Sequence, residues 1–495
     1  MIMMEEFYLD WVNNASYWFS KTDKIDNYIT EKYLGLLDSN FSLINPIAQI
    51  IIYDQLPRHF YRKELANHVI EYYLQKALTI VDFYKNDNNF LDKLTFTDWM
   101  FFMLPLRHSN KKENILFVAE KAWKLKEIPK KFLIATYEKA NFKEDLELQI
   151  NEAPKFNKSI LEYYPPTNFI KNPSYHIGDF SSISKYQYNQ TIIVSLSGGV
   201  DSMVCLLNIV DLYYDKYNIV AVHINYNNRE ETEEEVKYLK NVCYYFNVKL
   251  YVRKISEINR NKCMKNDMRD IYEKYTKKIR FNSYKSISVN PIVILGHNKD
   301  DAFENILTNI TYRNKYENLT GMDIISEIDN ITFIRPLLNV SKDEIYKFAK
   351  DHNIAYLKNS TPNWSQRGKI RNNVVPALNN WDSRTINGMF NLSDVLKEYD
   401  IILKNIINDF QDNQIFNINN INLSMLYWRS GIFKIFNKYP SYKSLKSLIE
   451  RLELFKKYYS KTDIHKYTKI IITNTIILEI CKLKDNKAHI RIYSN

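Results

Sequence analysis

The spacing of apolar residues divides the chain into three stretches of different character. From the first residues to about residue 170, apolar side chains recur at intervals near three and four, most clearly from Asp26 to Leu37 and from Ala66 to Tyr84. That interval is the period of an amphipathic helix. The pattern predicts an all-helical accessory domain over residues 1–170, which ends in a proline- and serine-containing stretch around residues 153–184.

Short runs of β-branched and other apolar residues begin after that stretch. They cover Thr191 to Leu196, Ile219 to Asn225, Lys249 to Arg253, Ile292 to Leu295, and Ile331 to Arg335. Segments of helix-forming length separate the runs, and such alternation is typical of βαβ units with a parallel sheet. The pattern predicts an α/β domain over residues 185–376.

Helix-like periodicity returns after about residue 376. We therefore expect residues 377–495 to form a mostly helical region, with two short strands at Lys469 to Thr475 and His489 to Tyr493.

Composition narrows the setting in which the chain works. The net charge is +11 and the pI about 9.0, which favours a polyanionic partner such as nucleic acid. The four cysteines form no Cys-x-x-Cys pair and no cluster with zinc spacing, as expected of reduced thiols in the cytoplasm. No apolar run approaches the ~20 residues of a membrane helix, so no membrane contact is predicted.

An anion-binding loop is predicted where the first strand meets the next helix. The string Ser-Leu-Ser-Gly-Gly-Val-Asp-Ser spans residues 195–202 and precedes a helix from Met203 to Val210. The first N–H groups of a helix have no intrahelical partner, and the helix dipole adds positive potential there. Two glycines let the backbone curl so that its N–H groups converge on phosphate oxygens. Asp201 beside phosphate calls for a magnesium ion or a structural hydrogen bond.

This string is the signature of the PP-loop ATP pyrophosphatases, and the downstream residues are similar to tRNA(Ile)-lysidine synthetases within that superfamily. Residues 296–304 match the pattern Gly-His-x-x-Asp-Asp-x-x-Glu closely. The other similar segments are Ala221 to Arg229, Lys278 to Phe281, Leu319 to Met322, Ile334 to Leu338 and Arg367 to Pro376. The motifs follow in the family's order over about 190 residues of the chain.

The resemblance implies an adenine nucleotide alpha hydrolase-like fold, with ATP and Mg²⁺ as cofactors. The catalytic residues it implies are Asp201, Arg280, His297, Asp301, Glu304 and Arg371. The nucleotide-binding residues are Ser197, Gly198, Gly199, Val200, Asp201, Ser202, His223 and Gly296. The magnesium ligands are Asp201, Asp300 and Asp301. Residues 300 and 304 are four apart on a helix, so we expect these two carboxylates to share one face.

The implied reaction has two steps. The C2 oxygen of a cytidine, in the anticodon of a tRNA, attacks the α-phosphate of ATP and pyrophosphate leaves. An amine, lysine in the family, then attacks the activated carbon and AMP departs. The protein contributes positioning and charge stabilisation.

Several substrate-facing positions depart from the family pattern. Asn225 and Tyr226 replace an acid and a histidine, Lys277 and Lys278 replace Arg-Glu, and the segment Asn359–Asn363 replaces Asp-Pro-Thr-Asn. Two alternatives therefore stay open. One is a PP-loop tRNA thiolation enzyme, which the absence of a cysteine pair disfavours, and the other is a nucleotide- or RNA-binding protein that has lost catalysis.

The C-terminal region offers a candidate tRNA surface. Its basic and aromatic residues are Lys434, Lys438, Lys443, Lys446, Arg451, Lys456, Lys457 and Lys461, interleaved with Tyr439, Tyr442, Tyr458 and Tyr459. This mixture suits phosphate contacts and base stacking, although a solvated basic helix face has the same composition. Next to a PP-loop domain, tRNA binding is the preferred interpretation.

The N-terminal region carries a second resemblance. Residues 53–62 and 101–109 look like two signatures of a helical, tetratricopeptide-like family, domain of unknown function 924. Its charged residues are Asp54, Arg58, Arg62, Arg107 and His108. They form either a polar site or a buried salt-bridge network that joins two helices, and the network is the preferred interpretation.

Overall fold

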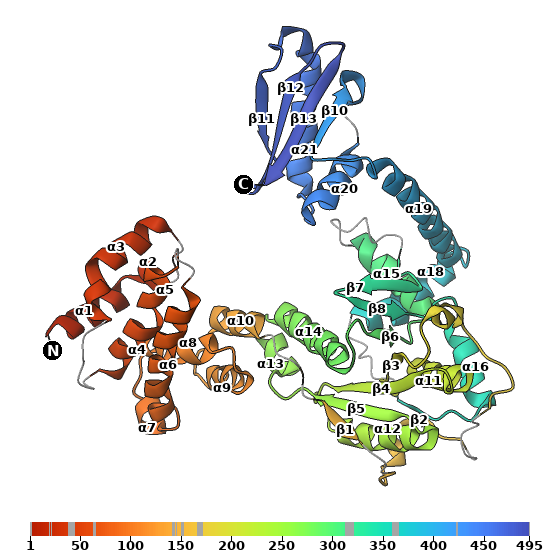
Figure 1. Ribbon diagram of the computed structural model, residues 1–495. Coiled ribbons are helices and arrows are strands. Elements are labelled where there is room, and N and C mark those ends of the chain that lie inside the picture. The colour runs from red at the N-terminus through yellow and green to blue at the C-terminus, as the bar shows by residue number, and fades with distance from the viewer. Residues whose placement is uncertain are drawn as a thin grey trace.

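The computed structural model has three regions in sequence order, which Figure 1 shows as a helical domain, a central domain around a twisted sheet, and a C-terminal region with a second sheet. The residues that the structure describes are 2–18, 20, 22–37, 45–62, 66–140, 144, 146–149, 153–165, 172–311, 321–358, 366–421 and 424–494.

The N-terminal region is a stack of helices around the nearly buried helix α8 (Phe96–His108), which packs against α4, α6 and α9. The predicted helical stretches correspond to α3 and α6. The other helices are α1 (Ile2–Asn13), α2 (Ala15–Trp18), α3 (Asp23–Tyr33), α4 (Pro46–Asp54), α5 (Leu56–Phe60), α6 (Asn67–Tyr84), α7 (Asn88–Leu91), α9 (Lys112–Ala122) and α10 (Lys130–Lys139).

The prediction of helix up to about residue 170 is wrong for the last part of that stretch, because α10 ends at Lys139. Strand β1 (Glu147–Gln149) pairs antiparallel with β5 of the central sheet, and β2 (Leu161–Tyr163) pairs with β9 (Tyr356–Leu357). Strands of two or three residues are too short to show alternation, so their partners rather than their own sequence define them.

The central sheet has seven strands in the order β1-β5-β4-β3-β6-β8-β7. All five predicted strands are confirmed and run parallel. They are β3 (Thr191–Ser195), β4 (Asn218–Asn225), β5 (Lys249–Lys254), β6 (Ile292–Ile294) and β8 (Ile331–Ile334). An antiparallel strand that was not predicted, β7 (Ile325–Ile328), pairs with β8 and forms the edge of the sheet.

Alternate residues of these strands pack into two different hydrophobic cores. Ile193 and Val293 face a core shared with α14 (Arg269–Ile287) and continuous with the helical domain. Ile192 and Ile294 face the other core, which α11 (Val200–Tyr213), α12 (Thr232–Phe246) and α16 (Lys342–Asp351) cover. The chain leaves β3 toward β4 on one side and reaches β6 on the other. Such a reversal of strand order opens a crevice at the carboxyl ends of the two strands.

The C-terminal region contains helices and a four-stranded antiparallel sheet in the order β10-β13-β12-β11. The predicted strands overlap β11 and β13, while β10 and β12 were not predicted. The elements are α18 (Val375–Trp381), α19 (Thr385–Ile407), β10 (Asn413–Asn417), α20 (Met425–Phe436), α21 (Tyr442–Lys457), β11 (Tyr467–Ile471), β12 (Ile476–Lys482) and β13 (Lys487–Ser494). Among the described residues, no helix has the length and apolarity needed to cross a bilayer.

Candidate active site

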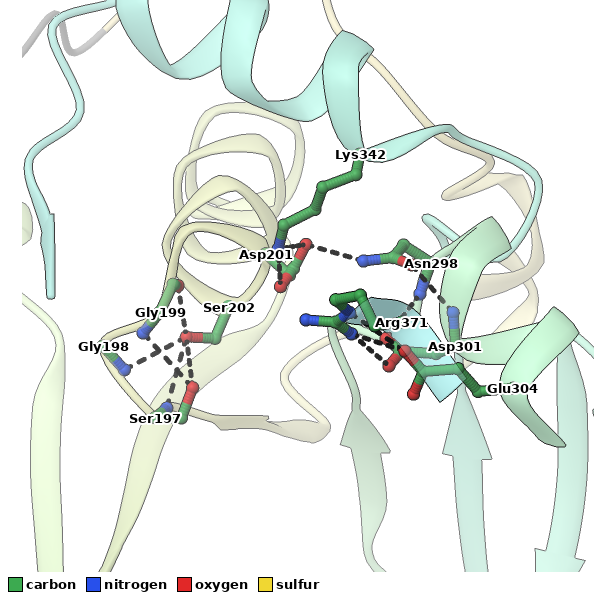
Figure 2. A network of polar contacts seen from close by, with 10 residues as sticks. All are labelled: Ser197, Gly198, Gly199, Asp201, Ser202, Asn298, Asp301, Glu304, Lys342 and Arg371. Atoms are coloured by element: carbon green, nitrogen blue, oxygen red, sulfur yellow. Dashed lines mark hydrogen bonds and ion pairs between the residues drawn. The ribbon is translucent and has the colours of Figure 1, made fainter. Parts of the chain in front are cut away.

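The loop between β3 and α11 is closed by one serine hydroxyl (Figure 2). The Oγ of Ser202 accepts hydrogen bonds from the N–H groups of Ser197 and Gly198, both at 3.2 Å, and donates to the carbonyl of Gly199 at 3.0 Å. Ser202 was predicted to bind the nucleotide, and here its hydroxyl stabilises the loop. The curl needs glycine at position 198, where φ is +84° and an added Cβ would lie 2.3 Å from Leu357 Cδ1.

Asp201, in the first turn of α11, joins three elements. Its carboxylate accepts hydrogen bonds from Lys342 Nζ at 2.7 and 2.8 Å and from Asn298 Nδ2 at 2.9 Å. Lys342 opens α16, and Asn298 lies just before α15 (Lys299–Thr311). Gly296 allows the close approach, because a Cβ there would lie 2.9 Å from backbone atoms of Asp201 and Ser202.

Asp301 is tied to the start of α15. Its backbone N–H donates to Asn298 Oδ1 at 3.0 Å, and its own Oδ2 accepts from the Asn298 N–H at 3.2 Å. This reciprocal pair caps the helix and fixes the carboxylate beside Asp201.

Arg371 faces the same end of α15. It lies in a π-helical turn (Ile370–Val374), and its guanidinium lies 2.8 Å from Glu304 Oε1 and 3.9 Å from Asp301 Oδ1. Burial lowers the pKa of Arg371, but the Glu304 carboxylate outweighs this and the pKa is raised overall. The expected pairing of Asp300 with Glu304 is not found. Asp300 is exposed, because the face of α15 turned toward Arg371 carries residues 301 and 304, three apart.

A cavity of about 240 Å³ lies at the carboxyl ends of β3 and β6. The predicted residues that line it are Ser197, Gly199, Val200, Asp201, His297, Asp301 and Arg371. Lys342, Arg229 and Lys358 add positive charge, and Glu162 and Glu235 add further carboxylates. The cavity thus carries similar numbers of both signs of charge.

His297 lies between this cavity and the motif at residues 334–338. Its Nδ1 accepts a hydrogen bond from Arg335 Nε at 3.2 Å, so in the neutral ring the proton is on Nε2. Arg335 is itself anchored by the carbonyl of Asp323 and the hydroxyl of Ser326. The ring is therefore oriented as a donor at the edge of the sheet.

His223 and Arg280 lie in an adjoining cavity of about 190 Å³ rather than with Arg371. The two cavities share Ser197, Arg229 and Glu235. His223 is buried and donates from Nδ1 to the carbonyl of Leu196 at 2.9 Å, and burial lowers its pKa. The substituted residues Asn225 and Tyr226 line the same space.

Lys342 is the main site residue that the sequence analysis missed. A Ser341–Glu344 capping box begins α16 and places Lys342 at its first position. A Ser-x-x-Glu string soon after the last parallel strand is the signal that could have found it. Arg229 closes a recognised motif but was not named as a site residue, and it forms a two-pronged ion pair with Glu235.

No group of three or more His, Cys, Asp or Glu side chains that could hold a metal is found in the part of the chain that the structure describes. Of the predicted magnesium ligands, Asp201 and Asp301 line one cavity and Asp300 does not. The altered segment Asn359–Asn363, and residues 319 and 320 of the predicted Leu319–Met322 motif, lie outside the described residues.

Two families match this chain. Residues 174–378 match the PP-loop domain, and residues 5–147 match the family described as bacterial protein of unknown function (DUF924).

Curated relatives match mainly over the central region. The chain is 28% identical over 218 residues to the tRNA(Ile)-lysidine synthase of Staphylococcus aureus (strain MRSA252), covering 43% of this chain and 49% of that one. The Mesoplasma florum protein of the same name is 31% identical over 211 residues, covering 41% and 51%. The Borreliella afzelii one is 27% identical over 302 residues, covering 60% and 63%. The chain spans about half the length of the first of these relatives.

Among solved structures, the chain is similar to the U34-tRNA thiolase NcsA from Methanococcus maripaludis with its 4Fe-4S cluster. The TM-score is 0.34 and the identity 16%, over 43% of this chain and 73% of that one.

Proposed function

We propose that this chain, which carries a PP-loop domain behind a DUF924 domain, is an ATP-dependent ligase that modifies a tRNA base. In this proposal it adenylates the base with release of pyrophosphate and then joins an amine such as lysine with release of AMP. The observation that carries the proposal is the convergence of Asp201, Lys342 and Asn298 beside the glycine loop, in a cavity that also holds Asp301, His297 and Arg371.

The loop and its flanking cations are the part suited to ATP phosphates. Ser197, Gly199 and Val200 line the cavity at the start of α11, where the helix dipole favours anions. Lys342 and Arg371 line the same cavity and supply positive charge to it. Lys342 releases Asp201 when it turns to a phosphate, so ATP and Asp201 compete for one ammonium group.

The residues present fit a magnesium ion that arrives with the nucleotide. Mg²⁺ is commonly held by one or two carboxylates together with substrate phosphates, so a cage of three protein ligands is not needed. Asp201 and Asp301 are the carboxylates in the right place for this. When bound, the ion would neutralise phosphate charge that the balanced cavity lining cannot.

Arg371 and His297 are the groups we assign to charge that develops during adenylation. Glu304 holds Arg371 in place at 2.8 Å, and Arg335 orients His297 at 3.2 Å. Groups fixed before the reaction stabilise developing charge without reorganising, which is the main source of electrostatic catalysis.

We assign the adjoining cavity to the substrate that is activated. It shares Ser197 with the first cavity, so a base placed there lies next to the phosphates. Buried His223 has a lowered pKa and stays neutral, and Arg280 supplies one positive charge. The C2 oxygen of cytidine would attack the α-phosphorus and displace pyrophosphate. The amine nitrogen would then attack C2, and AMP would leave with the former C2 oxygen.

The tRNA surface in this proposal is the exposed part of the basic C-terminal set. Lys434 and Lys456 donate to backbone carbonyls instead, and the Tyr459 hydroxyl does the same, so these three support the fold. The other members, all exposed, are Lys438, Lys443, Lys446, Arg451, Lys457 and Lys461, with Tyr439, Tyr442 and Tyr458.

Sulfur transfer is the less favoured alternative. The four cysteines, Cys205, Cys243, Cys263 and Cys481, are free and buried. Burial raises the pKa of Cys263 to about 11 and raises that of Cys205 and Cys243 further. A buried thiol with a raised pKa is a poor sulfur carrier.

The proposal is tested by AMP and pyrophosphate formation from ATP and magnesium, with and without bulk tRNA. We expect tRNA to stimulate both products, and Asp201→Asn to lower the rate about 10²- to 10³-fold. Asp211→Asn is the matched control, because Asp211 lies on the same helix but pairs with His176 outside the cavity. A folded protein that forms no AMP in either condition would leave the non-catalytic binding protein as the better account.

A further inference from the structure

The helical domain holds a cluster of charged side chains that the proposed function does not use. Asp54 is buried, and its carboxylate accepts hydrogen bonds from Arg58 at 3.0 Å, from His108 Nδ1 at 2.8 Å and from Gln55. Burial lowers the pKa of His108 to about 4, so its ring is neutral at pH 7. Arg62 belongs to a separate pair with Asp26, at 2.9 Å. Arg62 is therefore not part of the cluster around Asp54, although the sequence analysis had grouped the two residues.

Two further cations lie close enough to interact electrostatically with Asp54. Arg107 on α8 is only 9% exposed, and Lys139 ends α10. Neither makes a hydrogen bond or an ion pair with any residue that the structure describes, and Arg107 lies over the Phe132 ring at 4.8 Å. Burial and the nearby Arg58 and Arg107 lower the pKa of Lys139 to about 8, and burial lowers that of Arg107 to about 10.

The charges of the described residues in this cluster do not balance. Among the described residues, the carboxylate of Asp54 interacts with three cations, Arg58, Arg107 and Lys139, and its acceptor positions are already used. The carboxyl ends of α8 and α10 offset part of the excess, since a helix end carries only about half a charge. Burying a cation without a partner costs free energy, which a bound anion would recover.

We propose that this cluster, which is partly exposed at Arg58 and Lys139, binds the terminal phosphate group of a small ligand. Two guanidinium groups and an ammonium offer more donors than the two oxygens of a carboxylate can accept, and a phosphate monoester has three terminal oxygens and two negative charges. The burial of Arg107 favours a small terminal group over the backbone of a polymer that passes across a surface.

The position of Lys139 links this site to the PP-loop domain. Helix α10 packs against α14, where Lys278 donates to the carbonyl of Ala140 and Lys274 pairs with Glu138 at 2.7 Å. Lys278 is one of the residues that depart from the family pattern. An anion bound at Lys139 would thus be bound one residue away from the contact between the domains.

Calorimetric titration of the full chain with sulfate, inorganic phosphate and acetate at pH 8 tests the proposal. We expect sulfate and phosphate to bind at least tenfold more tightly than acetate. Lys139→Met, at a half-buried position, and Arg107→Met should each weaken binding at least tenfold. Lys131→Met on the same helix is exposed and should change nothing. Phosphate bound in the PP-loop cavity is distinguished by its loss in Lys342→Met instead.

A proton balance provides a second readout. An anion beside Lys139 raises its lowered pKa, so sulfate binding at pH 8 should take up protons, and this uptake should vanish in Lys139→Met. Ribose 5-phosphate represents a small ligand, and 5′-phosphorylated and 5′-hydroxyl trinucleotides represent RNA. Binding of the trinucleotides without ribose 5-phosphate would overturn the small-ligand assignment. Anion binding that is unchanged in both Lys139→Met and Arg107→Met would overturn the site itself.

Discussion

The Asp201–Lys342 ion pair makes a prediction at the scale of single residues. Replacing Lys342 with methionine removes two charge-assisted hydrogen bonds of 2.7 and 2.8 Å and a cation from the cavity wall. In the proposal the same ammonium turns to an ATP phosphate, and a charge-assisted bond of that kind contributes about 1.5–3 kcal/mol, so we expect kcat/KM for ATP to fall roughly 10- to 100-fold. Pyrophosphate release measures this, and Lys347→Met, exposed on the same helix, should match the unchanged protein. Equal rates for Lys342→Met and Lys347→Met would show that Lys342 does not contribute to the reaction with ATP.

Adjacent glycines give a matched pair of variants. Gly198→Ala forces a positive φ on a side chain and places Cβ 2.3 Å from Leu357, whereas the nearest atom to a Cβ at Gly199 is 3.5 Å away. We expect the first to destabilise the folded state by about 1–3 kcal/mol and the second by well under 1 kcal/mol. Denaturant midpoints measure the difference, and similar midpoints for the two variants would contradict the loop geometry.

The residue types of the site could be predicted from the sequence better than their partners. The string at 197–202 predicted a loop between a strand and a helix, and the structure has one. The same string could not show that the Ser202 hydroxyl would accept from the loop's own N–H groups. Likewise, Arg371 contacts Glu304 and Asp301, although it lies 67 residues after Glu304 in the chain. Helical spacing alone does not contain this contact, and it favoured Asp300 as the partner of Glu304.

At the scale of elements, the start of α16 fixes the position of Lys342. Ser341→Ala breaks the capping box and should cost about 1 kcal/mol of stability. It should also raise KM for ATP more than it lowers kcat, because Lys342 is the next residue. Ser441→Ala removes a similar cap from α21 and should cost a similar amount with no change in KM. A raised KM in both variants would show that the effect is not specific to α16.

The pair of α4 and α8 gives a pH prediction. The pKa of His108 falls to about 4 in the folded state from about 6.5 in an unfolded chain, so protonation favours unfolding. The contribution of the neutral His108 ring to the free energy of unfolding is complete above pH 6.5. It falls by up to about 3 kcal/mol as the pH drops to 4. Unfolding of the helical domain should show this slope, and His108→Gln should flatten it. An unchanged slope in His108→Gln would assign the pH dependence to other groups.

In the central sheet, prediction of the strands succeeded where most residues are buried. Strands β3, β4 and β6 are nearly continuous apolar runs because helices cover both sides of the sheet. Strands β1, β7 and β10 are three to five residues long and partly exposed, so no apolar run marks them. Their pairing depends on residues distant in the sequence, which a local pattern does not contain.

At the scale of the whole molecule, the helical and PP-loop domains share a junction. The Tyr137 hydroxyl on α10 donates to the carbonyl of Glu257 at 2.8 Å and accepts from Trp123 at 2.9 Å. Tyr137→Phe leaves these groups without that partner, so we expect the two domains to unfold in separate calorimetric transitions. Limited proteolysis should also separate the two domains faster.

Tyr217→Phe is the control for this junction. The Tyr217 hydroxyl donates to the carbonyl of Ile183 at 2.8 Å within the PP-loop domain. Loss of this hydroxyl should lower the free energy of unfolding by about 1–3 kcal/mol without separating the calorimetric transitions. A single transition in Tyr137→Phe would mean that the junction does not depend on this hydroxyl.

Mass spectrometry of nucleosides tests the proposed function most directly. The sample is tRNA incubated with the full chain, ATP, magnesium and lysine, and Asp201→Ala is the control. The proposed reaction predicts a new lysine-bearing cytidine that is absent with the variant. Folded protein that yields neither a modified nucleoside nor AMP would contradict it.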